Sequence, residues 1–226
     1  QACFDRIQDL QQMLTGTLNI GVTFSFSPIL TEALFAFIKL YPKVKLNIFY
    51  KPMAELMKML EQDEVDFALT FRPAELNKEI ESHFLFDNHL AVIVREDHPL
   101  AHKESVSIAE LEYYDLVLPA KGLQARNAFD IICEGSYHHL KVRMESNDVN
   151  ILLKLVKQSG MITILSETTI YNEEGFSSIP IDLRIREMEG CIHLKKNVYQ
   201  KRSSQEFIRL LRESNAVSER MQECMK

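Results

Sequence analysis

The sequence predicts an α/β fold made of two similar halves, each a sheet with helices packed on it. Short apolar runs typical of buried strands alternate with helical patterns, first over residues 16–88 and again over about 92–190. The 226 residues suffice for two domains of roughly 100 residues each. The composition, 46% hydrophobic and 26% charged, is that of an ordinary globular chain.

The first half opens with a strand, a polar loop, a helix and a second strand. Apolar residues alternate with smaller or polar ones over 18–22, as in a strand, and the loop 23–27 follows. Ser27 is the predicted N-cap of the helix, with Pro28 at its first position, where the missing N–H costs nothing. The second strand covers 44–48. The predicted apolar face of the helix consists of Leu30, Ala33, Leu34, Phe37, Ile38 and Tyr41.

The loop 23–27 is a candidate ligand contact because of its place in this unit. In open α/β sheets, ligands bind at the carboxyl ends of the strands, and Thr23 and Ser25 bring hydroxyls there. The amino end of the following helix offers N–H groups and a positive dipole end, which favour an anion. The loop therefore indicates a site for a small ligand with an anionic group.

The remaining elements continue the alternation. In the first half we expect a helix over 53–62, a strand over 65–71 that is apolar enough to be buried on both faces, and a strand at 84–86. The second half begins with a strand over 90–94 and a short helix capped by Ser107. Strands and helices are then expected in alternation over 116–119, 123–134, 141–145, 148–158, 161–165 and 167–171.

A strand over 192–198 and a last helix complete the pattern. Ser203 and Glu206 have the spacing of a capping box, which predicts the start of that helix. The chain thus crosses between the halves twice, near 89–93 and near 191–198. Two crossings form a hinge, and a hinge predicts a cleft that a ligand can close.

Composition and charge exclude several classes of protein. The net charge is −6, whereas a free-standing nucleic-acid-binding piece of this size is usually basic. No apolar run approaches the roughly 18 residues that span a bilayer, and the N-terminus has no signal-peptide pattern. Because an initiator Met is also missing, we expect a fragment of a longer cytoplasmic chain. The cysteines form no CxxC pair, which favours reduced thiols at Cys3, Cys133, Cys191 and Cys224.

Motifs for catalysis and metal binding are missing from the sequence. There is no G-x-S-x-G, no Walker loop and no HExxH. His138 and His139 are neighbours, but no second pair has ligand spacing. We therefore expect no enzymatic activity, no metal site and no cofactor.

The N-terminal residues 1–14 have helical spacing. Cys3, Ile7, Leu10 and Leu14 follow the a/d positions of a heptad. Two heptads are too short to form a stable helix alone, which leaves two interpretations. The segment is either a helix packed on its own domain or the tail of a longer dimerising helix.

An ordered series of motifs resembles the effector-binding region of LysR-type transcriptional regulators over roughly residues 15–212. Each motif is weak by itself, but their order and spacing together are specific. The motifs are Gly16–Gly21, Phe37 with Tyr41–Val44, Glu55–Leu56 with Leu60, Val65–Leu69, His98–Ala101, and Val106–Ser107 with Leu111.

The resemblance implies two subdomains of the type-2 periplasmic-binding-protein-like fold, with a small-molecule effector in the cleft between them. Subdomain I would comprise 15–89 and 193–226, and subdomain II would comprise 90–192. Residues 1–14 would be the end of a linker helix. The DNA-binding helix-turn-helix of the family would precede this sequence. The family's homodimers or homotetramers pack subdomain I on subdomain II of another chain, where Phe35, which lies off the buried stripe, is a candidate contact.

The sequence departs from the family pattern at a few positions. Asp63 stands where the family usually has Gly before the third strand, but Asp tolerates the left-handed conformation that a helix end needs. Met161 and Ser166 replace residues of a late glycine- and proline-containing motif, so the pocket there differs. Cys133 falls near one redox cysteine of the peroxide-sensing members, but Leu123 stands near the reactive one, so no thiol switch is expected.

The residues expected to meet the effector come from both halves. By the resemblance they are Thr23, Ser25, Phe26, Thr70, Phe71, Gln124, Asn147 and Met161. Three have an alternative interpretation: helix capping for Ser25 and Asn147, and core packing for Phe71. Phe26 favours an effector with an apolar part. The cations that either balance an anionic effector or remain solvated surface charges are Lys51, Arg72, Lys121 and Arg126.

Two other functions share this kind of fold. A solute-binding protein that delivers its ligand to a transporter would have a signal peptide or lipid anchor. A cleft enzyme would need a catalytic acid or base that the sequence does not supply. The heptad and the missing signal peptide favour the sensing domain of a transcription regulator.

Overall fold

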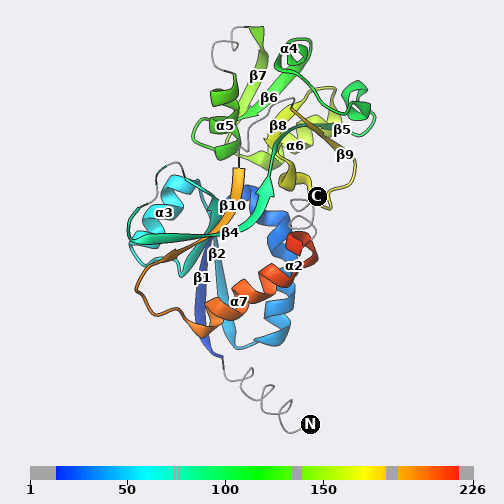
Figure 1. Cartoon of the computed structure of the whole chain (residues 1–226). Coiled ribbons are helices and arrows are strands. Elements are labelled where there is room, and N and C mark those ends of the chain that lie inside the picture. The colour runs from blue at the N-terminus through cyan, green and yellow to red at the C-terminus, as the bar shows by residue number, and fades with distance from the viewer. Residues whose placement is uncertain (1–13, 74, 76, 134–138, 182–187, 219–226) are drawn as a thin grey trace. The chain divides into compact units, whose positions relative to one another are not determined.

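The computed structural model describes residues 14–73, 75, 77–133, 139–181 and 188–218. The chain folds as two compact units, which Figure 1 labels by element. The first unit contains the chain up to Asp87 and from Glu189 onward, and the second runs from Asn88 to Met188. The predicted helix over 1–14 lies outside the described residues, except for Leu14.

A five-stranded sheet forms the centre of the first unit. Its strand order is β2-β1-β3-β10-β4, with β1 parallel to both β2 and β3 and β10 antiparallel to β3. The predicted strands of this half are present, but the one predicted over 192–198 begins four residues earlier and ends at Lys195. They span Gly16–Val22 (β1), Val44–Tyr50 (β2), Phe67–Phe71 (β3), Ile80–Asn88 (β4) and Met188–Lys195 (β10).

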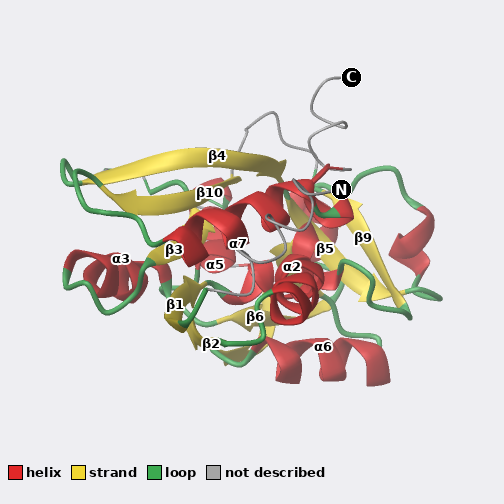
Figure 2. Ribbon diagram, turned by 90° about the horizontal axis from the view of Figure 1, so that it is seen from below, coloured by secondary structure: helices red, strands yellow, loops and turns green. Residues whose placement is uncertain are grey.

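Helices cover both faces of this sheet. On one face, α2 (Ser27–Leu40) lies beside α7 (Arg202–Glu213), as Figures 1 and 2 show. The ring of Phe207 in α7 lies 5.3 Å from Phe37 in α2 and 5.8 Å from Phe67 in β3. On the other face, α3 (Met53–Glu61) approaches so closely that a Cβ at Gly21 would lie 2.8 Å from Leu56 Cδ2. Glycine at this position therefore lets α3 pack directly on β1.

The second unit repeats the strand order of the first. Its three-stranded sheet has the order β8-β5-β9, and a parallel bridge between Leu116 and Ile162 adds the parallel pair β6 and β7 next to β8. The resulting order, β7-β6-β8-β5-β9, matches that of the first unit with β5 in the place of β10. The strands span Leu90–Arg95 (β5), Asp115–Pro119 (β6), Lys141–Ser146 (β7), Thr163–Ser166 (β8) and Phe176–Pro180 (β9).

The helices of the second unit begin close to their predicted positions. These are α4 (Ile108–Leu111), α5 (Gln124–Ile132) and α6 (Val149–Gln158). Ser107 and Glu110 form the capping box of α4, in which the Ser107 N–H donates to Glu110 Oε2 at 3.0 Å. Short 3₁₀ turns complete the chain at Phe24–Phe26 (η1), Pro99–His102 (η2) and Glu167–Ile170 (η4). None of the helices in the described ranges has both the length and the apolar character that a bilayer crossing needs.

Both predicted caps in the first unit were wrong. Ser27 is the first residue of α2 rather than its N-cap, because the 3₁₀ turn before it already has helical backbone, and its hydroxyl lies 3.1 Å from the Tyr50 hydroxyl. Ser203 and Glu206 form no capping box, since α7 begins two residues earlier than expected, with Lys201 rather than Ser203 at the N-cap position. Glu206 instead accepts a hydrogen bond of 3.0 Å from the Tyr41 hydroxyl.

Three further details differ from or extend the prediction. Ile38 was expected on the buried face of α2, but its side chain is 57% exposed. Strand β9 was not predicted, because its sequence Phe-Ser-Ser-Ile-Pro is polar and ends in proline, as edge strands allow. Asp63 has a φ of 59°, so the expected left-handed conformation before β3 is confirmed.

Candidate ligand-binding site

Two threonines lie side by side where β1 and β3 end, which we call the carboxyl edge of the first unit. The parallel register pairs Gly21 with Ala68 and Val22 with Leu69, and the Thr23 N–H donates to the Leu69 carbonyl at 3.0 Å. The next pair in this register is Thr23 and Thr70. Since side chains alternate between the faces of a sheet, both lie on the face that α3 covers at Gly21.

The hydroxyls of both threonines lack a partner. Thr23 is 7% exposed and Thr70 is fully buried, and neither Oγ1 atom hydrogen-bonds to any described residue. Leaving a buried hydroxyl unsatisfied costs about 1–3 kcal/mol. Other such atoms in the described chain are Asn88 Oδ1, Thr163 Oγ1, Thr169 Oγ1 and His193 Nε2. Thr23 and Thr70 differ from these because they are neighbours at the edge where ligands bind in sheets of this kind.

The polar row continues from β3 onto β10. Thr70 is paired with Cys191, and beyond them the Arg72 N–H donates to the Glu189 carbonyl at 2.8 Å. The Arg72 side chain makes an ion pair with the Glu189 carboxylate. The first unit therefore has a partly exposed guanidinium one step beyond its two unpartnered hydroxyls.

A histidine lies one step further into the same face. His193 on β10 is fully buried, and its Nδ1 lies 2.7 Å from the Ser82 hydroxyl on β4. Burial lowers the pKa of His193 to about 4, so the ring is neutral at pH 7. The row of Thr23, Thr70, Cys191 and His193 is therefore uncharged, and Arg72 and Glu189 are the charged pair at its outer end.

The two predicted aromatic contacts lie in the core of the first unit. Phe26 is 1% exposed, and its ring centroid lies 5.2 Å from that of Phe71 and 5.3 Å from that of Phe86. Core packing thus accounts for both Phe26 and Phe71. Ser25 is half-buried in η1, two residues after Thr23. The role of these three residues as effector contacts remains a prediction.

The structure brings two of the three predicted residues of the second unit to one edge. The Ala120 N–H donates to the Ser146 carbonyl at 2.8 Å, so the ends of β6 and β7 are adjacent. Gln124 begins α5 and Asn147 precedes α6, both just beyond this edge. Asn147 is exposed and is not the N-cap, because Asp148 Oδ1 accepts from the Asn150 N–H at 2.9 Å.

Met161 lies at the opposite end of that sheet. The next residue, Ile162, pairs with the beginning of β6, where its N–H donates to the Asp115 carbonyl at 3.0 Å. The Met161 side chain packs against a core cluster of Val117, Leu152 and Val156. The described part of the second unit therefore separates Met161 from Gln124 and Asn147 by the length of β6.

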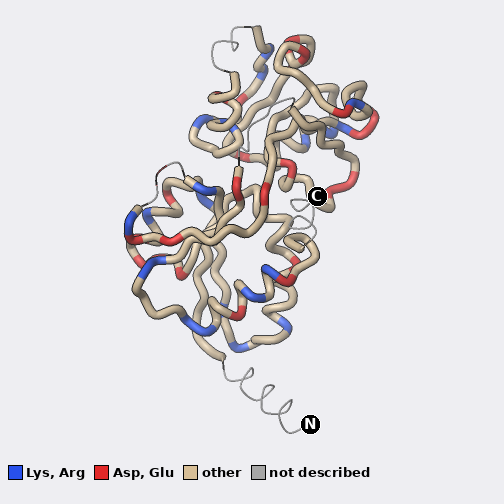
Figure 3. Tube along the Cα trace, viewed as in Figure 1, with Lys and Arg blue, Asp and Glu red and all other residues tan. Residues whose placement is uncertain are grey.

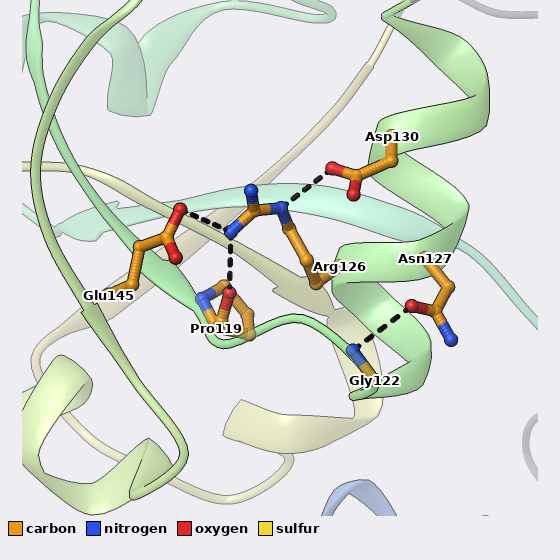
Figure 4. A network of polar contacts seen from close by, with 6 residues as sticks. All are labelled: Pro119, Gly122, Arg126, Asn127, Asp130 and Glu145. Atoms are coloured by element: carbon orange, nitrogen blue, oxygen red, sulfur yellow. Dashed lines mark hydrogen bonds and ion pairs between the residues drawn. The ribbon is translucent and has the colours of Figure 1, made fainter.

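Arg126 holds the carboxyl edge of the second unit together (Figure 4). It is 4% exposed, and its guanidinium bonds Asp130 at 2.6 Å, Glu145 at 2.7 Å and the Pro119 carbonyl at 3.1 Å. These partners belong to α5, β7 and the end of β6. Neither predicted role for this residue, a solvated surface charge or a counter-charge for the effector, describes a guanidinium that two carboxylates already neutralise.

The other candidate cations differ in their surroundings. Lys51 pairs with Glu55 at 3.2 Å, one turn along the chain, and both side chains are about half exposed. Lys121 is exposed on the loop before α5. Lys51 lies beside Thr23, because β2 pairs Tyr50 with Val22 and the Lys51 N–H donates to the Val22 carbonyl at 3.3 Å. Arg72 lies beyond Thr70 on the face that carries both threonines. Its place was readable from the sequence, because Arg72 follows Thr70 at the two-residue spacing of one strand face, whereas Glu189 and Cys191 gave no signal.

Two small cavities in the first unit lie away from its carboxyl edge. The larger, of about 290 Å³, lies at the start of β3, and the smaller, of about 220 Å³, adjoins it across Leu194 and Gln200. In the larger cavity, Lys195 pairs with Asp63 and Lys201 with Asp66, each at 2.8 Å. Its charges are thus mutually neutralised.

The described cysteines and possible metal ligands give no reactive centre. Cys133 and Cys191 are buried free thiols, and burial raises their pKa values to about 12 and about 11. Both are protonated at pH 7, and the thiol is the unreactive form. Within the described ranges, no three His, Cys, Asp or Glu side chains gather as metal ligands.

Comparison with known proteins identifies the family. The family model described as the LysR substrate binding domain matches residues 11–216. The HTH-type transcriptional regulator CbbR of Rhizobium meliloti (strain 1021) is 26% identical over 170 residues, which cover 75% of this chain and 54% of that protein. The HTH-type transcriptional regulator YtlI of Bacillus subtilis (strain 168) is 35% identical over 112 residues, 49% of this chain and 36% of that protein. The chain thus spans about half the length, or less, of these relatives.

A solved structure shows the same fold. The regulatory domain of CcmR from Synechocystis PCC6803, in complex with 2-PG, matches with a TM-score of 0.75 at 21% identity, over 88% of this chain and 97% of that chain. The fold is therefore the type-2 periplasmic-binding-protein-like fold of two α/β subdomains. Because the family model matches nearly the whole sequence, the chain belongs to the family of LysR substrate-binding domains.

Proposed function

We propose that this chain is the effector-sensing part of a bacterial LysR-type transcription regulator. The observation that carries the proposal is the pair of adjacent, buried and unpartnered hydroxyls of Thr23 and Thr70 at the carboxyl edge of a LysR substrate-binding domain. Buried polar atoms in native proteins are normally hydrogen-bonded. In this proposal, a bound ligand supplies the hydrogen-bond partners that the two hydroxyls lack.

The effector we propose is a small anionic metabolite bound between the two subdomains. The first unit, up to Asp87 and from Glu189 onward, would be subdomain I and contribute Thr23, Ser25 and Thr70. The second unit, Asn88 to Met188, would be subdomain II and contribute Gln124 and Asn147. The CcmR regulatory domain was solved in complex with 2-PG, which supports a small-molecule ligand for a domain of this fold.

DNA binding, in this proposal, belongs to a helix-turn-helix outside this sequence. The relatives are named HTH-type regulators, and they are about twice as long as the matched region. Residues 1–14 would end the linker helix that leads to it. Basic and acidic residues are interspersed along both described units (Figure 3), and the net charge is −6, which suits a sensing rather than a DNA-gripping part. The regulator would act in the cytoplasm, and catalysis is no part of its role.

The proposed assembly is a homodimer or homotetramer that packs subdomain I on subdomain II of another chain. The outer face of α2 supports this, because Phe35 is 74% and Ile38 57% exposed on neighbouring positions of one helix. Ile151 on α6 is an exposed apolar residue of the other subdomain that suits the opposite side of the contact.

A ligand screen followed by a DNA-binding assay tests the proposal. Small carboxylates, sulfur metabolites and aromatic acids are screened by thermal shift, since a ligand that binds only the folded state raises its melting temperature. We expect at least one hit, and we expect the Thr23→Ala/Ser25→Ala double variant to lose it. The full-length protein should bind its own promoter DNA, in a pattern that the hit changes. A full-length protein that binds no promoter DNA overturns the regulatory role.

A further inference from the structure

The surroundings of the candidate cations indicate which of them can bind an anionic group of the effector. Lys51, which precedes α3, pairs with Glu55 in the first turn of that helix, and Arg126 is buried between two carboxylates and a carbonyl. Arg72 has one carboxylate partner, Glu189, and a partly exposed side chain. Lys51 also has one carboxylate partner and is at least as exposed, and Lys121 is an exposed lysine of the second unit. Arg72 differs from both lysines in its guanidinium, whose fork of N–H donors can hold a carboxylate or phosphate with two bonds.

The geometry of the strands puts Arg72 next to the unpartnered hydroxyls. Arg72 follows Thr70 by two residues, so the alternation of β3 continues onto the same face. The bond from the Arg72 N–H to the Glu189 carbonyl keeps this segment in register with β10. The residue spacing along a strand is about 3.3 Å, so Thr70 and Arg72 are about 7 Å apart along β3, the span of a small ligand.

From this arrangement we infer that Arg72 binds an anionic group of the effector, while the hydroxyls of Thr23 and Thr70 bind oxygen atoms of the same ligand and Glu189 competes with it for the guanidinium. The inference rests on the proposed function and adds the residue that selects for charge. A carboxylate or a phosphate group fits it, because both accept two N–H bonds from one guanidinium.

The hydrogen-bonding capacity of Arg72 allows a shared arrangement. A guanidinium has five N–H donors, and the bond to the Glu189 carboxylate occupies one of them, Nε–H, so donors remain for ligand oxygens. Glu189 keeps Arg72 neutralised without ligand, so an incoming anion must share or displace that carboxylate. Removing the charge of Glu189 should therefore strengthen anion binding, whereas removing that of Arg72 should weaken it.

Charged and neutral probes of matched shape test this inference on the 226-residue chain. Malonate and inorganic phosphate are titrated against malonamide and glycerol at constant ionic strength, with melting temperature and calorimetry as readouts. We expect Arg72→Met to weaken binding of the anions about 10- to 100-fold, as for loss of a charge-assisted hydrogen bond. Glu189→Gln should tighten it about 3- to 10-fold, and Arg72→Lys should keep part of the affinity.

Lys51→Met is the comparison variant, because it removes the cation beside Thr23. An ammonium lacks the fork of N–H donors by which a guanidinium holds an anion with two bonds, so anion affinity should fall less than in Arg72→Met. Glu189→Gln retains Arg72 and is expected to bind anions more tightly. If the Arg72–Glu189 ion pair had only a structural role, this variant should instead bind anions more weakly.

Three results would overturn the inference. If neither malonate nor phosphate binds the wild-type chain even at high concentration, Arg72 is not an anion-binding residue. Equal losses in Arg72→Met and Lys51→Met show a general charge effect. A neutral ligand that binds with an affinity independent of Arg72 also refutes it, yet leaves the sensing function intact, because the full-length protein can still respond to that ligand on DNA.

Discussion

At the scale of single residues, the sequence predicts a ligand site from the hydroxyls of Thr23 and Thr70, but it does not reveal whether these hydroxyls are buried or hydrogen-bonded. Thr23 and Thr70 stood out because each ends a predicted strand. That their hydroxyls are buried and unpartnered depends on the register between β1 and β3 and on the packing of α3, which no local pattern contains. Arg126 illustrates the same limit, because its burial depends on Glu145, nineteen residues away.

Replacing Thr70 by valine separates a ligand contact from a structural residue. Valine has nearly the same shape but no hydroxyl, so Thr70→Val should stabilise the ligand-free chain by about 1 kcal/mol. The thermal shift given by an effector should be lost. Thr163→Val is the control, since Thr163 is an equally buried, unpartnered threonine in the other unit, and should keep the shift. A Thr70→Val chain that keeps the full shift contradicts the role of this hydroxyl.

His193 predicts how stability depends on pH. Its pKa is about 4 when folded and about 6.5 when unfolded, so below pH 6.5 the unfolded chain takes up a proton that the folded chain refuses. Stability is therefore complete above pH 6.5 and falls as the pH drops toward 4. Between pH 7.5 and 5 we expect His193 to account for a loss of about 2 kcal/mol.

Urea unfolding across that pH range measures this effect. His193→Gln should flatten the dependence, whereas His102→Gln, at an exposed position, should leave it unchanged. Burial also lowers the pKa of His98, which keeps part of the slope in both variants. An unchanged slope in His193→Gln would show that the buried ring does not control stability in this range.

At the scale of elements, strand and helix order was predictable, while element ends were not. The alternating and helical patterns of 18–22, 53–62 and 148–158 carry their own signal, and the capping box of α4 is purely local. The cap predictions for α2 and α7 were wrong for two reasons. The turn η1 precedes Ser27 directly, so Ser27 is already inside α2, and Glu206 accepts a hydrogen bond from Tyr41. Strand β9 was missed because its pairing with β5 compensates for a weak strand sequence.

The Arg126 network connects three elements of the second unit, and its members should contribute unequally to the free energy of unfolding. Arg126→Met removes bonds to α5, β7 and the end of β6 together and should cost about 2 kcal/mol. Glu145→Gln should cost less than about 1 kcal/mol, because Glu145 is partly exposed and Arg126 retains Asp130. Urea unfolding of both variants gives the comparison, and equal losses would contradict a network centred on Arg126.

The exposed face of α2 gives a prediction about assembly. Phe35→Glu should change the stability of the single chain by less than about 0.5 kcal/mol, since the side chain already faces solvent. It should shift the protein toward monomer in sedimentation velocity. Tyr113→Glu, at an exposed aromatic in the other unit, serves as the control. A Phe35→Glu chain that remains as associated as the wild type counts against this interface.

At the scale of the whole molecule, the repeated strand order explains why the sequence was so informative. In both units a parallel strand pair lies next to a third strand, and the fourth strand in the order is the one by which the chain enters from the other unit. Each unit therefore has an equivalent carboxyl edge. The order of motifs therefore predicted fold and family. The pairing of Arg72 with Glu189 could not be predicted from the sequence, because 117 residues and the entire second unit separate them in the chain.

Hydrogen–deuterium exchange with and without an effector tests most directly where the ligand binds. Backbone amides exchange more slowly where a ligand suppresses local opening. We predict added protection over residues 22–27 and 69–73 of the wild type, and its loss in Thr23→Val/Thr70→Val. Protection confined to residues 60–66 and 194–204, around the cavity at the start of β3, would place the ligand at the other end of the sheet and contradict the account.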